Sequence, residues 1–93
     1  MLLTKSTICK HISPPNVTVE QMHEKIQQLV DEGKTDGIYT CTVITDSVGY
    51  GVRNWVDEAA ASEWIEFMRS HGDTNEYKIL DLIDKELIST ITF

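Results

Sequence analysis

The sequence has few of the residues that binding to nucleic acid or to an anionic membrane requires. It carries eight Lys and Arg against fifteen Asp and Glu, which gives a formal charge of −7. Phosphate backbones and anionic lipid surfaces are bound through clustered Lys and Arg side chains. The basic residues here are few and scattered, so we expect neither a nucleic-acid partner nor a membrane partner.

Long hydrophobic runs are also missing. No apolar run approaches the roughly 20 residues that a helix needs to cross a bilayer. The apolar residues 1–3 are followed at once by Thr4, Lys5 and Ser6, so no signal-peptide hydrophobic segment forms. We therefore expect a cytoplasmic protein.

Cysteine and histidine are too sparse to predict a disulfide framework, a metal site or a bound cofactor. The two cysteines, Cys9 and Cys41, form no CxxC pair, and His11 and His23 have no partner at metal-ligand spacing. Since free Cys behaves as a small hydrophobe, we expect both cysteines to be buried or half-buried in strands. Residues 49–51 read Gly-Tyr-Gly, but they lead into a strand rather than a helix and so make no nucleotide loop.

What is present is enough for one domain. The 93 residues are 41% hydrophobic and 25% charged, close to the average of globular domains. We expect an α+β domain over residues 1–83, followed by a C-terminal tail over 84–93. The tail is apolar enough, at Leu87, Ile88 and Phe93, that we expect it to pack on the domain or on a dimer partner.

The order of predicted elements specifies the fold class. Helices are predicted from Val19 to Glu32 and from the Asp57 cap to Gly72, and Thr18 with Gln21 has the capping-box pattern. Strands are predicted over residues 2–12, 38–45, 50–56 and 77–83, with a turn over 46–49 between the second and third. This is the βαββαβ order of a ferredoxin-like sandwich, with an antiparallel four-stranded sheet and two helices on one face.

The usual strand order of that fold, 4-1-3-2, separates the two cysteines. Cys9 and Cys41 fall on the first and second strands, which lie roughly 9.6 Å apart with the third strand between them. A disulfide needs Cα atoms within about 7 Å, so we expect no bridge.

Both faces of the predicted sheet carry apolar residues, although two helices can cover only one. We expect the uncovered face to hold Trp55, Leu80, Leu82 and part of the Tyr39–Val43 segment, which would be a sizeable apolar patch. A second copy of the chain packed sheet against sheet would bury it, so a homodimer is predicted. The candidate interface residues are Cys41, Val43, Arg53, Trp55, Leu80 and Leu82.

Arg53 and Trp55 alternate on one strand face and have a second interpretation. Together they would bind an anionic aromatic ligand by ion pairing and stacking. The interface role is favoured, because Trp and Arg are enriched at the centres of interfaces.

The segment from Arg53 to Ala60, Arg-Asn-Trp-Val-Asp-Glu-Ala-Ala, enters a helix that carries Trp64 and Phe67. In this the chain resembles the dimeric α/β-barrel superfamily, which includes the antibiotic-biosynthesis monooxygenases, over about residues 1–83. The resemblance implies a small cavity between sheet and helices. Some members of the superfamily oxidise polycyclic aromatics or haem without a conventional redox cofactor.

The haem-degrading members of that superfamily use an Asn on the first strand, with a Trp and a His on the second helix. Trp64 and His71 match the helix positions here, at a shorter interval, but the predicted first strand has no Asn. Haem degradation is therefore not expected.

Two functions are compatible with the sequence, and it identifies no catalytic residue. The first is a non-catalytic homodimeric domain that binds a small molecule or a protein partner. The alternative is a cofactor-independent monooxygenase acting on an aromatic substrate, with a ligand pocket near Tyr39, Tyr50, Trp64 and His71. Trp64 also fits a plain core position, and His71 also fits the end of a helix, where its charge would complement the helix dipole.

Overall fold

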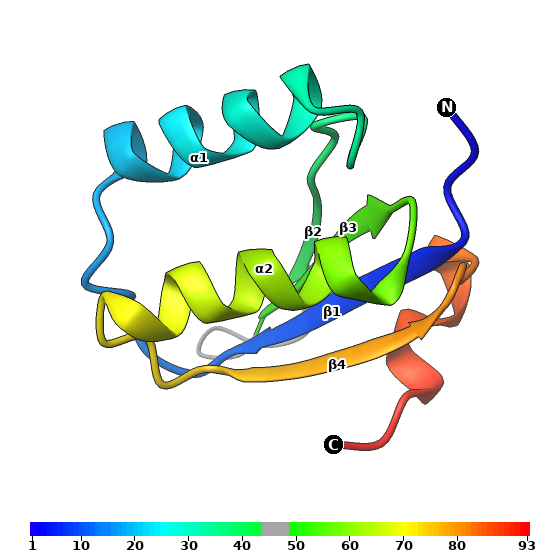
Figure 1. The fold of residues 1–93 in the computed structure, drawn as a ribbon. Helices are drawn as coiled ribbons and strands as arrows, with labels where there is room; N and C mark the ends of the chain where they lie inside the picture. Colours follow the sequence, from blue (N-terminus) through cyan, green and yellow to red (C-terminus); the bar gives the residue numbers. More distant parts are fainter. Residues whose placement is uncertain (44–48) are drawn as a thin grey trace.

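An antiparallel sheet with two helices on one side forms the body of the domain (Figure 1). The computed structural model describes residues 1–43 and 49–93. The strand order is β2-β3-β1-β4, so the predicted ferredoxin-like fold is confirmed. The elements in chain order are β1 (Lys5–His11), α1 (Val19–Asp31), β2 (Thr40–Val43), β3 (Gly49–Trp55), α2 (Glu58–Ser70), β4 (Glu76–Asp81) and the 3-10 helix η1 (Lys85–Thr90).

The first and fourth predicted strands are longer than the segments that pair in the sheet. The first was expected over 2–12 and the fourth over 77–83, but the ladder between them pairs only Lys5 to Lys10 with Asp81 to Glu76. Gly49, expected in a turn, is already part of β3, where it pairs with His11 of β1. Residues 44–48, which include the end of the second predicted strand and most of the predicted turn, lie outside the described residues.

The helix ends follow the local sequence. At α1 the Gln21 N–H donates to Thr18 Oγ1 at 3.1 Å, and the Thr18 N–H donates to Gln21 Oε1 at 3.0 Å, which is the predicted capping box. The Asp57 carboxylate accepts a backbone N–H of α2 at 2.8 Å. Gly33 and Gly72 follow the two helices with φ of 73° and 86°, a backbone conformation that glycine adopts without a Cβ clash. In the part of the chain that the structure describes, no helix is long and apolar enough to cross a bilayer.

The larger core lies between the helices and the sheet, and Trp55 is at its centre. Trp55 is completely buried, and its ring stacks on Trp64 of α2 with 6.3 Å between ring centres. The indole N–H of Trp55 donates to Thr7 Oγ1 of β1 at 3.0 Å. Leu29 of α1 packs in the same cluster, so this core joins both helices to the sheet.

The opposite side of the sheet carries a second, smaller core made by the C-terminal segment. Ile88 of η1 is buried against Ile8 of β1 and Val52 of β3. The Phe93 ring lies 5.6 Å from that of Tyr50, measured between centres. Figure 1 shows the segment on the side of β4 away from the helices. The chain thus covers part of this face itself.

The expected open face of Trp55, Leu80 and Leu82 is therefore wrong. The ladder pairs Thr7 with Arg53 and with Ile79, which places these three residues and Trp55 on the helix side. Leu80 is on the other side, packed against the smaller core, and Leu82 lies beyond the end of β4 with 53% of its surface exposed. Arg53 and Trp55 share one face of β3 as predicted, but β3 and β4 were placed in the wrong phase relative to one another, so Leu80 was put on the face of Trp55.

Candidate ligand-binding cavity

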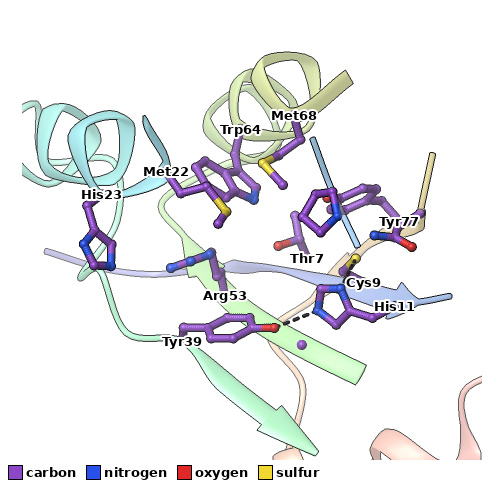
Figure 2. A pocket seen from close by; sticks show the side chains of 13 residues that line it. Thr7, Cys9, His11, Met22, His23, Tyr39, Arg53, Trp64, Met68 and Tyr77 are labelled. Atoms are coloured by element: carbon purple, nitrogen blue, oxygen red, sulfur yellow. Dashed lines mark hydrogen bonds between the residues drawn. The ribbon is translucent and has the colours of Figure 1, made fainter. Parts of the chain in front are cut away.

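A cavity of about 250 Å³ lies between the two helices and the sheet (Figure 2). Strands β1 and β3 form its floor, α1 and α2 form its walls, and Tyr39 lies just before β2. The lining side chains that the structure describes are mostly apolar or aromatic, and none of these is a carboxylate. They come from Thr7, Cys9, His11, Pro15, Met22, His23, Tyr39, Gly51, Arg53, Trp64, Met68, Asn75 and Tyr77.

In the floor of the cavity, Gly51 leaves room for the ring of Tyr39. Gly51 pairs with Cys9 on one side and with Cys41 on the other, in the middle of the sheet. A Cβ at this position would overlap with the ring of Tyr39, which lies against the bare backbone. Glycine at residue 51 thus lets Tyr39 fold over the sheet at the edge of the cavity.

His11 links Tyr39 to Cys9. Its Nε2 lies 2.7 Å from Tyr39 Oη, and its Nδ1 lies 3.5 Å from Cys9 Sγ. Burial, followed by the nearby charge of Arg53, lowers the pKa of His11, and Asp73 opposes the shift. The imidazole is therefore neutral at pH 7, able to donate from one nitrogen and accept at the other.

The other titratable groups beside His11 are held in their neutral forms. Burial raises the pKa of the Cys9 thiol to about 12, so the thiolate is scarce at neutral pH. Burial also raises the pKa of Tyr39, with further contributions from the cysteines beside it. Neither group is an activated nucleophile or base at neutral pH.

Arg53 is the fixed positive charge of the cavity. Its Cζ lies 4.6 Å from the ring centre of Tyr39 and 4.9 Å from that of Trp64, so the guanidinium is stacked between two aromatic rings. Figure 2 shows it between these two side chains. Burial lowers the pKa of Arg53, although the group stays charged. Within residues 1–43 and 49–93 no Asp or Glu forms an ion pair with it.

One end of the cavity is closed by a buried polar turn after α2. Asn75 is completely buried, and its Oδ1 accepts the backbone N–H groups of Ile12 and Ser13 at 2.8 and 3.0 Å. The Asp73 carboxylate accepts the N–H of Asn75 at 2.9 Å and the hydroxyl of Tyr77. These bonds tie the end of β1 to the start of β4. Burial, then the bond to Asp73, raises the pKa of Tyr77.

Of the four predicted pocket residues, the structure brings two together. Tyr39 and Trp64 both line the cavity and lie on either side of Arg53. Tyr50 is on the opposite side of the sheet, packed against the smaller core. His71 caps α2, where its Nδ1 lies 2.9 Å from the carbonyl oxygen of Phe67, and it lines a separate, more open depression between the helices.

The six predicted interface residues are also dispersed. Arg53 lines the cavity and Trp55 is buried in the main core. Leu80 is half-buried under the tail, and Val43 pairs with Gly49 at the end of β2. Both cysteines are free, with Cys9 buried and Cys41 exposed. The expectation of burial is therefore wrong for Cys41. Its strand, β2, is at one edge of the sheet, and η1 lies beside β4, at the opposite edge, on the side away from the helices.

No protein-family model matches the chain, and no curated protein is similar to it in sequence. Among solved structures it is similar to a conserved protein from Methanosarcina mazei Go1, at 16% sequence identity and a TM-score of 0.44. That similarity covers 84% of this chain and 91% of the other.

Proposed function

We propose that this chain binds a small organic molecule in the cavity of Figure 2 and does not transform it. The observation that supports the proposal is the combination of apolar walls with a few polar groups that converge on one space. Arg53 and His11 supply these groups, and Met22 and Met68 supply two of the apolar walls. This is the usual composition of small-molecule sites. The volume, about 250 Å³, is that of about eight waters at ~30 Å³ each, so the ligand is small.

The states of the cavity's ionisable groups favour binding over catalysis. The Cys9 thiol is protonated at neutral pH, and burial favours the neutral form of Tyr39. Among the described residues, no carboxylate lines the space to act as a general acid or base.

The alternative is a cofactor-independent monooxygenase acting on an aromatic substrate, and His11 is the residue that favours it. Its neutral imidazole lines the cavity and could accept a proton from a phenolic substrate. Consumption of oxygen on mixing the protein with polyhydroxylated aromatics, abolished in His11→Gln, would select this function over simple binding.

We further propose that the chain is a homodimeric member of the dimeric α/β-barrel superfamily. The support is the ferredoxin-like layout and the segment from Arg53 to Ala60, with apolar surface at Leu82 and Leu87 that a second copy would cover. Sedimentation at micromolar concentration tests the dimer, and a single monomeric species would overturn it. The cytoplasmic location stays a prediction from the sequence.

A cavity-filling variant tests the binding proposal. Met22→Trp adds volume inside the cavity from α1, whereas Val19→Trp adds the same ring at a position on α1 that is 62% exposed. For ring-bearing compounds that bind the wild type in calorimetry, we expect Met22→Trp to weaken binding about tenfold or more. Val19→Trp is expected to change it less than about twofold. Equal affinity for all three proteins, each folded by circular dichroism, would refute the cavity as the site.

A further inference from the structure

We infer that the ligand of this cavity is an aromatic carboxylate, held by its carboxylate on the edge of the Arg53 guanidinium. This inference rests on the proposed function and names the class of ligand. It starts from the position of Arg53, whose guanidinium carbon lies over the rings of Tyr39 and Trp64 in the lining of the cavity.

Stacking fixes the plane of the guanidinium. With Tyr39 on one face and Trp64 on the other, at 4.6 and 4.9 Å from Cζ, Arg53 cannot tilt out of that plane without losing both contacts. The N–H groups of a guanidinium all point outward in its own plane. A ligand that pairs with Arg53 would therefore approach in the plane of the guanidinium, from the cavity that Arg53 lines.

The charge of Arg53 is not balanced by a carboxylate on the described part of the chain. The ion pairs there join Lys5, Lys25 and Lys34 to acidic residues, and none includes Arg53. None of the other described lining residues is an Asp or a Glu, so none of them supplies a carboxylate. A half-buried cation without an anion is costly, and a bound anion would offset that cost.

The shape of the anionic group follows from the donor. A guanidinium matches a carboxylate in a two-point, coplanar arrangement, which a single arginine can complete. A phosphate would carry more charge, and in the described lining Arg53 is the one Lys or Arg side chain that could meet it. We therefore assign a carboxylate rather than a phosphate.

The rest of the ligand must suit the walls. Met22, Met68 and Pro15 present apolar surface to the remainder of the space. Flat rings pack well against Met thioethers. Within about 250 Å³, one ring with a short acid-bearing chain is the size that fits.

The test uses matched pairs that differ only in charge. Benzoate, 3-phenylpropanoate and indole-3-acetate are compared with their primary amides by calorimetry, with phenyl phosphate as a further probe. Hydrogen bonds to charged groups are worth about 1.5–3 kcal/mol, or roughly 10- to 150-fold in affinity. We expect at least one acid to bind about tenfold or more tightly than its amide.

Variants of Arg53 test whether this residue causes the preference for acids over amides. Arg53→Met keeps the length and apolar stem of the side chain and is expected to remove the preference for acid over amide, leaving amide affinity within about threefold. Arg53→Lys keeps the charge but loses the planar fork, so we expect a partial loss. In the wild type, the Arg53 Nε–H resonance should shift with the acid and not with the amide, which gives a readout independent of variant stability.

The outcomes separate this inference from the proposed function. Equal binding of acids and amides, unchanged in Arg53→Met but abolished in Met22→Trp, would overturn the carboxylate assignment and leave the cavity as a binding site. Tighter binding of phenyl phosphate than of every acid would also overturn it. Failure of every acid to bind below about 1 mM would overturn the inference as well. Absence of binding by neutral ring compounds too would refute the proposed function.

Discussion

The ring of Tyr39 occupies the space where any residue other than glycine would place its Cβ at position 51. Tyr39 lies just before β2 and Gly51 lies in the neighbouring strand β3, at the edge of the cavity. From this position Tyr39 Oη lies 2.7 Å from His11 Nε2. A single missing side chain in β3 thus determines where one wall of the site lies. This relationship is the first to be tested.

Alanine at position 51 should displace Tyr39 and destabilise the fold. Overpacking of this kind costs about 1–3 kcal/mol, and we expect a loss in that range from urea denaturation of Gly51→Ala. The control is the same substitution in a Tyr39→Ala background, where the clash has been removed. An equal cost in both backgrounds would show that the two residues do not compete for this space.

The hydrogen bond between Trp55 and Thr7 should contribute measurably to stability. Thr7→Val removes the acceptor while keeping the shape, and it leaves the buried indole N–H without a partner. Such an orphaned donor costs about 1–3 kcal/mol. Thr4→Val, at an exposed position of the same N-terminal segment, is the control and should cost less. Equal small losses for both would contradict the assigned role of Thr7.

The C-terminal segment should behave as part of the folding unit. Ile88 is 2% exposed and Leu87, beside it, is 55% exposed. We expect Ile88→Ala to cost about 2–5 kcal/mol in the free energy of unfolding, and Leu87→Ala to stay within about 0.5 kcal/mol. If both variants unfold at the wild-type urea concentration, η1 does not stabilise the sheet.

The stability of the protein should decrease as the pH is lowered, and His11 should account for part of this decrease. Its pKa in the folded state is below the ordinary value of 6.5, so the unfolded chain binds the proton more tightly. The stability contribution is therefore complete above about pH 6.5 and is lost as the pH falls toward the folded pKa. We expect His11→Gln to reduce the slope of stability against pH between 7 and 5.

His23→Gln is the control for that experiment, because His23 is exposed on α1. It should preserve the dependence that His11 produces. The interpretation fails if His11→Gln has the wild-type slope, or if the two variants lose the same part of it.

The sequence predicted the order of elements well, because the signals involved are local. Thr18 with Gln21 marks the start of α1, Asp57 marks the start of α2, and Gly33 and Gly72 mark their ends, each through its own backbone chemistry. The strand order followed from the fold class, and with it the separation of the cysteines.

The site was harder to predict because it depends on register. Alternation correctly put Arg53 with Trp55, but only the pairing of Thr7 with Arg53 and Ile79 decides that they face the helices. A shift of one residue reverses the faces of a strand, and no local signal fixes it. Leu80 was grouped with Trp55 for this reason.

Other site residues are visible in the sequence, but their patterns indicate different kinds of site. His11 was considered only as a metal ligand, and Gly51 only as part of a nucleotide loop, whereas both form the cavity. A glycine inside a strand indicates close approach by another group, which was the available signal for Gly51. Asn75 has no such signal, since its role requires the end of β1 to lie beside it.

The methionines provide the most direct measurement of the central claim, that this cavity binds a small molecule. Met22 and Met68 line the cavity, whereas Met1 is 69% exposed and lies outside its lining. Titration of protein labelled at the methionine methyl groups with 3-phenylpropanoate, followed by NMR, should shift the Met22 and Met68 signals and leave Met1 unchanged. Shifts of all three methyl groups alike, or no shift at Met22 and Met68 with a ligand that calorimetry shows to bind, would contradict the account.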